Sequence, residues 1–234
     1  MKAFETWTTL KHDPLEKHGD NLWSVTGTMP NPNINRRMVL ARLANGGLVI
    51  HNAIALDDAS MAELEAFGDP AYLLVPNGFH RQDAFIYKQR YPKLRVLCPR
   101  ASTAKVKQVV ETDGTFEDLP SDPRVKLFHL RGVKDREGAL FVQSDTGSSV
   151  AFCDVVMNIP KRSGLIGFAI APTGRPGIPR FSRWMTVSDK AAFRAHLEEL
   201  ASPADLKRVL VGHGKNLTDD PGATLKALAT ELLS

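Results

Sequence analysis

Short apolar runs alternate with amphipathic segments along almost the whole chain, and this alternation restricts the fold more than any other feature. Residues 72–75 (YLLV) form a run that is typical of a buried strand. Residues 58–67 (DASMAELEAF) repeat their apolar positions with the period of a helix. Two turn signals, Asn45-Gly46-Gly47 and Asp145-Thr146-Gly147, each predict a hairpin. Helices interleaved with hairpins favour an α/β protein with mixed sheets and with helices on the outer faces.

The same patterns predict the individual elements. We expect strands at residues 21–28, 37–43, 48–50, 72–75, 94–97, 125–130, 139–143, 149–153 and 209–211, and helices at 58–67, 82–91, 101–111, 188–200 and 222–233. The first of these helices has Asp58 or Ser60 as a candidate cap and Gly68 as a stop signal. Residues 158–184 form a Gly/Pro-rich stretch that is longer than most loops, which is typical of lids and binding loops. We expect Phe181 and Trp184 to pack this loop onto the domain.

Length and composition indicate a single domain that covers residues 1–234. The chain is 43% hydrophobic, which is enough for one sizeable core. No apolar run reaches the roughly 18 residues of a membrane-spanning helix, and the polar N-terminus does not look like a signal peptide. We therefore expect a cytoplasmic protein with no membrane partner. No motif typical of nucleic-acid binding is present, so we expect no nucleic-acid partner either. The sequence leaves the oligomeric state open.

Basic residues gather in the predicted loop. Between residues 161 and 183 there are five cations and no acid: Lys161, Arg162, Arg175, Arg180 and Arg183. Such a segment can attract a phosphate or another anionic small molecule, and we consider Arg175 and Arg180, together with Asn77, as substrate-binding residues. The alternative is an ordinary solvated loop.

Polar side chains follow three of the predicted buried strands. His80 and Asp83 come after residues 72–75, Asp154 comes after residues 150–153, and His213 stands between two glycines after residues 208–211. Ligands in open α/β sheets bind beyond the carboxyl ends of the strands, so these side chains converge if the strands are neighbours. Two imidazoles and a carboxylate suit zinc, manganese or iron. Alternatively, each residue is a hydrogen-bonded structural group.

The order of the elements resembles the metallo-β-lactamase superfamily over about residues 20–232. The stretch 46–52 (GGLVIHN) is similar to an early strand of that family. Asp154 matches the aspartate that bridges two metals in the family, and His213 matches the final histidine. The resemblance implies a metallo-β-lactamase-like αββα sandwich.

The departures from the family pattern concern its metal ligands. The four ligand positions of the His-x-His-x-Asp-His signature fall on Asn77, Phe79, Arg81 and Gln82. A shift by one residue places His80 on the second histidine and Asp83 on the last position. Valine stands in place of the histidine in the Gly-His turn, at residues 131–133. The stretch from Pro76 to His80 resembles a branch of the superfamily with a degenerate metal-binding motif, so the resemblance does not imply a two-metal hydrolase.

These observations lead to three hypotheses. The first is a protein of this fold that has lost most metal ligands, a non-catalytic or altered-site member that needs no cofactor and binds a small molecule. The second is a mononuclear metal-dependent hydrolase of an anionic small molecule, in which His80, Asp154 and His213 hold one zinc, manganese or iron ion and Asp83 is the general base. The third is metal-free acid–base catalysis by His80 or His213 with Asp154 as the orienting carboxylate.

Overall fold

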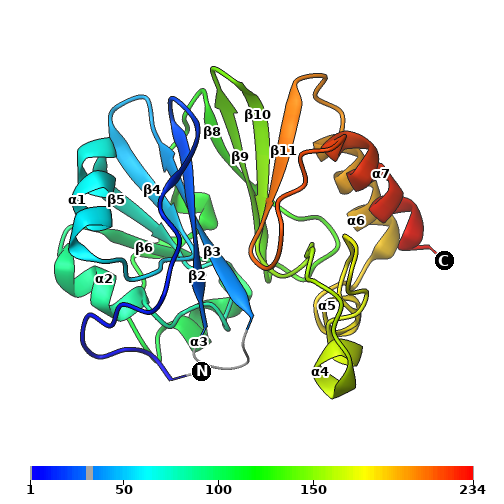
Figure 1. Ribbon diagram of the computed structural model, residues 1–234, viewed down its shortest axis with the longest axis horizontal. Coiled ribbons are helices and arrows are strands. Elements are labelled where there is room, and N and C mark those ends of the chain that lie inside the picture. Colours follow the sequence, from blue (N-terminus) through cyan, green and yellow to red (C-terminus); the bar gives the residue numbers. More distant parts are fainter. Residues whose placement is uncertain (1, 30–33, 234) are drawn as a thin grey trace. The chain divides into compact units, whose positions relative to one another are not determined.

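The computed structural model describes residues 2–29 and 34–233, and the chain divides into two compact units. Unit 1 runs from Met1 to Leu127 and unit 2 from Phe128 to Ser234. Each unit contains its own hydrophobic core. Each also has its own sheet with helices, which Figure 1 shows. Among the described residues, no helix has the length and apolar character needed to cross a membrane.

Unit 1 is built on a seven-stranded sheet in which the strands follow one another in chain order. The first four strands pair antiparallel, and the remaining three join them in parallel. The strands are β1 (Glu16–Gly19), β2 (Leu22–Thr28), β3 (Asn35–Arg42), β4 (Gly47–His51), β5 (Asp69–Leu74), β6 (Arg95–Cys98) and β7 (Gly114–Thr115). The predicted hairpin at Asn45-Gly46-Gly47 is confirmed as the β3–β4 pair, with Gly46 at a φ of 87°.

Helices α1 (Asp58–Phe67), α2 (Ala84–Arg90) and α3 (Thr103–Val106) belong to the same unit. Helix α1 has the predicted bounds, but its cap is Asp57, whose carboxylate accepts a hydrogen bond of 2.8 Å from the Ser60 amide. Its buried face inserts Met61, Leu64 and Phe67 into the core, which explains why this helix forms where its apolar period places it.

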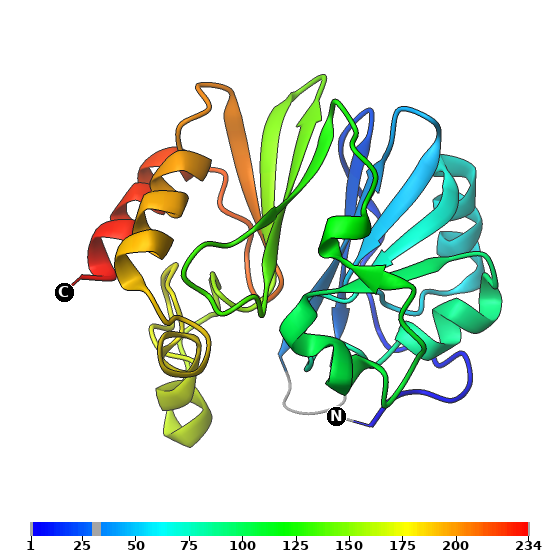
Figure 2. The ribbon, with the colours of Figure 1, turned by 180° about the vertical axis from the view of Figure 1, so that it is seen from behind.

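Unit 2 contains a four-stranded sheet in the order β11-β10-β9-β8. The strands are β8 (Val125–His129), at which the two units join, β9 (Gly138–Ser144), β10 (Gly147–Phe152) and β11 (Leu206–Val211). The predicted hairpin around Asp145-Thr146-Gly147 is confirmed as β9–β10, whereas β11 pairs with β10 in parallel. Helices α6 (Lys190–Leu200) and α7 (Pro221–Glu231) lie side by side over one face of this sheet in Figures 1 and 2.

Three predictions about single elements were wrong. The helix expected at 101–111 contains only a 3-10 turn (Arg100–Ser102) and α3. The stretch 158–184 is not a continuous loop, because it contains α4 (Gly164–Ala169) and the start of α5 (Arg180–Met185). Trp184 does not pack onto the domain, since its side chain is 70% exposed. The α/β class with mixed sheets and helices is confirmed, while the single domain over residues 1–234 stays a prediction.

Candidate functional site

The carboxyl ends of β10 and β11 bring Asp154 and His213 together in unit 2. In the parallel register Phe152 lies beside Val211, so the residues two positions further along each strand are also neighbours. The Asp154 Oδ1 atom lies 3.2 Å from the His213 Nε2 atom, and both side chains are almost fully buried. The two residues therefore converge because β10 and β11 are parallel neighbours, which is the condition under which the sequence predicts it.

Glu137, which precedes β9, holds the turn that carries Asp154. Its carboxylate accepts hydrogen bonds from three successive backbone amides: Cys153 at 2.8 Å, Asp154 at 3.0 Å and Val155 at 3.3 Å. On the other side, the Ser182 hydroxyl donates to the Asp154 carbonyl at 2.8 Å. These contacts fix the backbone of Asp154 and leave its carboxylate to face His213. Nothing in the local sequence around Glu137 indicates this role.

Burial also governs the ionisation of this cluster. Burial of Glu137, followed by repulsion from the Asp154 carboxylate, raises the pKa of Glu137 to about 8, although the three amide donors favour its charged form. Burial raises the pKa of the Cys153 thiol well above its usual value, with Asp154 and Glu137 acting in the same direction. Cys153 is therefore a neutral thiol, as expected for a cysteine in an apolar strand, and is a poor nucleophile.

The separation of the Asp154 and His213 atoms suits two kinds of chemistry. A distance of 3.2 Å allows the imidazole Nε2–H to donate to the carboxylate, which would orient a base or a ligand-binding group. Two donor atoms bound to one zinc ion at about 2.1 Å lie about 3.4 Å apart in tetrahedral geometry, so the pair also suits adjacent ligands of one metal ion.

His80 belongs to unit 1, where Asn52 fixes its tautomer. The Asn52 Nδ2 atom donates to the Arg37 carbonyl at 2.8 Å, and a carbonyl can only accept. The Asn52 Oδ1 atom must then be the one that faces His80 Nδ1, at 3.0 Å. Because an amide oxygen only accepts, His80 carries its proton on Nδ1 and its lone pair on Nε2. This tautomer suits a metal ligand or a proton acceptor at Nε2.

His51, the last residue of β4, is a buried histidine in the same unit. Its Nε2 atom has no hydrogen-bond partner among the described residues. Burial, and to a lesser degree the nearby His80, lowers the pKa of His51 to about 3. The ring is therefore neutral at physiological pH.

The loop that follows β5 uses its polar side chains for local contacts. The Asn77 Oδ1 atom accepts from the amides of Phe79, at 2.9 Å, and His80, at 3.2 Å. The Arg81 guanidinium binds the Lys105 carbonyl and the Gln108 side chain. Asn77 thus shapes the loop, and its expected contact with a substrate stays a prediction.

Asp83 is fully buried beneath this loop. One carboxylate oxygen pairs with Arg36 and the other accepts from the Ala55 amide at 2.9 Å. These contacts are those of a buried ion pair that holds two segments of unit 1 together. The general-base role expected from the sequence stays a prediction, for which Asp83 would have to release one of these partners.

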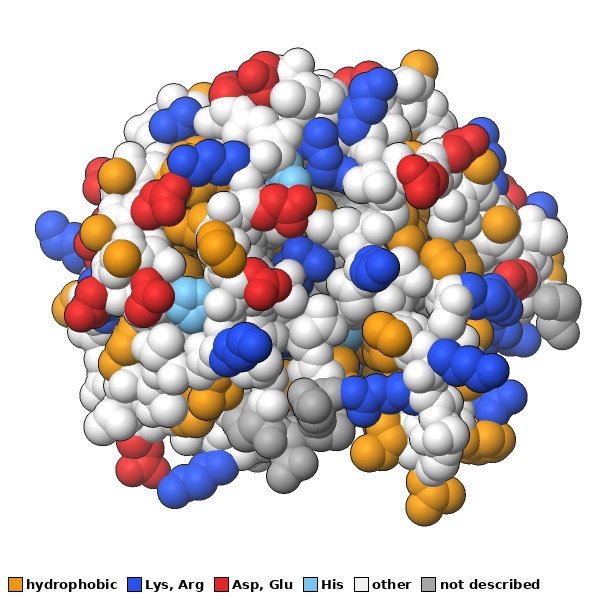
Figure 3. Space-filling view, viewed as in Figure 1, with side chains coloured by type: hydrophobic (Ala, Val, Ile, Leu, Met, Phe, Trp, Pro, Cys, Tyr) orange, Lys and Arg blue, Asp and Glu red, His pale blue; other side chains and the backbone are white. Residues whose placement is uncertain are grey.

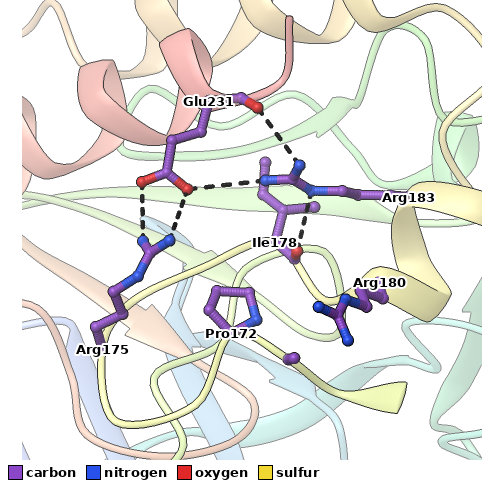
Figure 4. A pocket seen from close by; sticks show the side chains of 7 residues that line it. Pro172, Arg175, Ile178, Arg180, Arg183 and Glu231 are labelled. Atoms are coloured by element: carbon purple, nitrogen blue, oxygen red, sulfur yellow. Dashed lines mark hydrogen bonds and ion pairs between the residues drawn. The ribbon is translucent and has the colours of Figure 1, made fainter. Parts of the chain in front are cut away.

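The arginines expected to bind substrate line a surface pocket of about 410 Å³ in unit 2, drawn in Figure 4. Arg175 makes a two-pronged ion pair with Glu231, at 2.8 and 3.1 Å, and Arg183 lies 3.8 Å from the same carboxylate. Arg180 has no ion-pair partner among the described residues and lies over the Phe168 ring, 4.3 Å from its centroid. Glu231 therefore neutralises part of the pocket's positive charge, and Arg180 is the arginine best placed to meet an anion.

The sequence predicts Asp154, His213 and His80 as site residues, but it does not indicate the residues that orient them. Glu137 acts through backbone amides, and Asn52 through a carbonyl on the neighbouring strand. Asn52 carries one signal that a sequence reader could use, since asparagine is enriched at left-handed positions and its φ is 62°.

Comparison with solved structures finds metallo-β-lactamases along almost the entire chain. FIM-1 from Pseudomonas aeruginosa, in its mono-zinc form, is 12% identical over 94% of this chain and 96% of that chain, with a TM-score of 0.59. DIM-1 exposed to ceftazidime is 11% identical over 96% and 98%, with a TM-score of 0.61. An enzyme from Pontibacter korlensis is 10% identical over 94% and 99%, with a TM-score of 0.59. Comparisons with family models and with curated proteins gave no match.

The chain therefore has the metallo-β-lactamase fold, as its order of elements predicts. At identities of 10–12% this similarity defines the fold alone, because many unrelated activities share one scaffold. The function has to be inferred from the side chains of this chain.

Proposed function

We propose that this protein is an altered-site, non-catalytic member of the metallo-β-lactamase fold that binds a small molecule. In this proposal Asp154 and His213 of unit 2 serve as hydrogen-bonding groups for the ligand and not as parts of a two-metal centre. Arg175 and Arg180 would favour an anionic ligand.

One observation carries the proposal: the side chains at the family's signature positions do not fit a two-metal centre. A two-metal site needs nearly all of its histidine and carboxylate ligands, and these positions hold Asn77, Phe79, Arg81 and Gln82. Asn77 and Arg81 are already engaged in contacts within unit 1. The alignment shifted by one residue does not restore the metal ligands of the signature, because the carboxylate of Asp83 pairs with Arg36.

A second candidate is the mononuclear metal-dependent hydrolase. Its support is the 3.2 Å separation of Asp154 and His213, which suits two ligands of one ion. The bound metal would supply an activated water. In this candidate Glu137 would hold Asp154 in place.

Metal content distinguishes the two candidates. We would purify the chain without a histidine tag or chelator and measure bound metal by mass spectrometry in the native protein and in His213→Ala. His129→Ala is the control, because His129 pairs with Asp135 on unit 2 outside the Asp154–His213 pair. The proposal predicts far less than one equivalent in all three proteins and no thermal stabilisation by added zinc, manganese or iron. About one equivalent that disappears only in His213→Ala would reject the proposal in favour of the hydrolase.

The ligand-binding part needs its own measurement. A thermal-shift screen of anionic small molecules should find compounds that stabilise the native protein and stabilise Arg180→Ala less. Equal stabilisation of the native protein and of Arg180→Ala would show that Arg180 does not contribute to ligand binding.

A further inference from the structure

Helices α4 and α5 of unit 2 carry an unusual concentration of exposed apolar side chains. Five large hydrophobic residues are exposed there: Leu165, at 89%, Trp184, at 70%, and Ile166, Phe168 and Met185. Elsewhere in the described part of the chain, only Phe79 and Leu233 are exposed large hydrophobic residues. We call these five residues of α4 and α5 the apolar patch. Exposed apolar residues that are concentrated in one part of the chain mark a binding surface more often than scattered single residues do.

The chain segment that carries the apolar patch contains basic residues and no acidic residue. No Asp or Glu occurs between Asp154 and Asp189, whereas five Lys and Arg residues do. Arg175 and Arg183 pair with Glu231, but Lys161 and Arg180 form no ion pair among the described residues. In the space-filling view of Figure 3, basic side chains lie beside the hydrophobic ones at the end of unit 2 that carries α4.

Cations and apolar groups are also in direct contact at this surface. The Arg180 guanidinium covers the exposed Phe168 ring at 4.3 Å, so one charged group and one apolar ring are presented together. Helix α4 lies beyond α5, at the end of unit 2 away from its sheet, in both ribbon views (Figures 1 and 2). Leu165, Ile166 and Phe168 are thus carried on a helix that projects from unit 2.

We infer that the apolar patch docks on the surface of an anionic lipid bilayer. The apolar side chains would enter the boundary between headgroups and acyl chains, while Lys161 and Arg180 would stay at the level of the lipid phosphates. Trp184 suits this position because its ring is apolar and its N–H can bond to a headgroup.

Charge complementarity favours a bilayer over a protein as the occupant. A membrane leaflet with anionic lipids presents one sign of charge over a wide area, which matches Lys161 and Arg180, the cations that form no ion pair among the described residues. The rim of a protein interface is polar and usually mixes both signs, and its apolar core needs a complementary cavity. This inference departs from the expectation of no membrane partner, which rested on the lack of long apolar runs and on the polar N-terminus. Docking on a bilayer surface requires neither a membrane-spanning helix nor a signal peptide. The inference is also independent of whether a metal binds.

The expected change in the partition coefficient follows from the contribution of each cation and that of each buried apolar side chain. Each cation at an anionic surface contributes about 1 kcal/mol, which corresponds to about a fivefold change in the partition coefficient. Burial of a leucine side chain at the interface contributes at least about a tenfold change. Loss of either kind of residue should therefore be measurable.

The test is vesicle binding by the full chain, measured by co-sedimentation and by tryptophan emission. Vesicles of phosphatidylcholine alone are compared with vesicles that also contain phosphatidylglycerol. We expect binding to the anionic vesicles only, weakening with salt, and a blue shift of emission that is lost in Trp184→Phe. Lys161→Ala should reduce the partition coefficient about fivefold and Leu165→Ala about tenfold.

Two matched variants complete the design. Lys126→Ala and Leu233→Ala also remove an exposed lysine and an exposed leucine, but outside residues 161–185, and they should bind like the native protein. The inference is overturned if neither vesicle binds, if binding ignores lipid charge, or if the matched variants lose as much as Lys161→Ala and Leu165→Ala. A dimer in light scattering that dissociates in Leu165→Glu would assign the apolar patch to a second copy of the chain and would also overturn it.

Discussion

At the scale of single residues, the side chains that follow the strands are oriented by partners with fixed donor and acceptor roles. Asn52 can only accept from His80, because its amide nitrogen is committed to the Arg37 carbonyl. Glu137 accepts hydrogen bonds from three backbone amides and so determines the position of the Asp154 backbone. Orientation of this kind is what a ligand-binding or metal-binding side chain requires, whichever of the two proposed functions holds.

Asn52→Ala should allow His80 to populate both of its neutral tautomers. In the native protein above the pH at which histidine titrates, nitrogen NMR should show a protonated Nδ1 and an unprotonated Nε2 in His80. The variant should shift both nitrogens toward the average of the two tautomers, while His129, in unit 2, stays unchanged. A native His80 that carries its proton on Nε2 would contradict the hydrogen-bond assignment.

His51 should make the protein sensitive to mild acid. Its pKa in the folded chain is about 3, below the 6.5 of an ordinary imidazole, so the unfolded chain takes up this proton first as the pH falls. Stability from this group is complete above pH 6.5 and is lost toward pH 3, by up to about 1.4 kcal/mol per pH unit. Urea unfolding at several pH values measures how the free energy of unfolding depends on pH. Between pH 6.5 and pH 3 this free energy should fall less steeply in His51→Gln than in the native chain. Equal slopes would mean that the His51 ring does not resist protonation.

At the scale of elements, the parallel β10–β11 pair and the turns beyond it create the Asp154–His213 pair. Gly214 follows His213 with a φ of 100°, and a Cβ atom there would overlap the carbonyl oxygen of Asn158. Glycine at this position therefore allows the chain to pass close to the segment that follows Asp154. The pairing of β10 with β11 alone would not determine the position of the His213 imidazole, which also depends on this turn.

Gly214→Ala should be much more destabilising than Gly164→Ala. Both glycines have positive φ, but a Cβ atom on Gly164 would meet no atom within 4 Å. Gly164→Ala should cost only the left-handed strain, about 1 kcal/mol. Gly214→Ala adds a clash with backbone and should cost about 3 kcal/mol or more. Chemical denaturation measures both values, and similar costs would show that the chain around Asn158 can move aside.

At the scale of the whole molecule, two separate cores support the chain. The core of unit 1 surrounds Tyr87 and the core of unit 2 surrounds Phe193, and both side chains are fully buried. The fold is nevertheless that of the metallo-β-lactamases over 94% or more of the chain. A single cooperative domain is expected from length, and unfolding can test it.

Phe193→Ala should destabilise both units together if the chain is one cooperative domain. The substitution creates a cavity in unit 2 and should cost about 3–5 kcal/mol. Trp7 and Trp23 report on unit 1, because they pack against its core. Their fluorescence should therefore lose its native value at a lower denaturant concentration in the variant. An unchanged fluorescence midpoint, together with earlier loss of amide protection in unit 2, would reveal two independent domains.

The sequence by itself determined the class of the fold and most of its elements. Apolar period placed helix α1, and the turn residues at Gly46 and Gly147 placed two hairpins, because these signals depend on neighbours along the chain. The same reasoning placed Asp154 and His213 just beyond two buried strands. It left open whether those strands are neighbours, which the parallel β10–β11 pair decides.

Only the tertiary structure decided which side chains have partners and which face solvent. Glu137 and Asn52 act on groups that are distant along the chain, and no local pattern encodes such a contact. The exposure of Leu165 and Trp184 was equally hidden, because an apolar residue reads the same in a sequence whether it is buried or not. Periodicity is a property of the chain, whereas burial and hydrogen bonding depend on segments that meet only after folding.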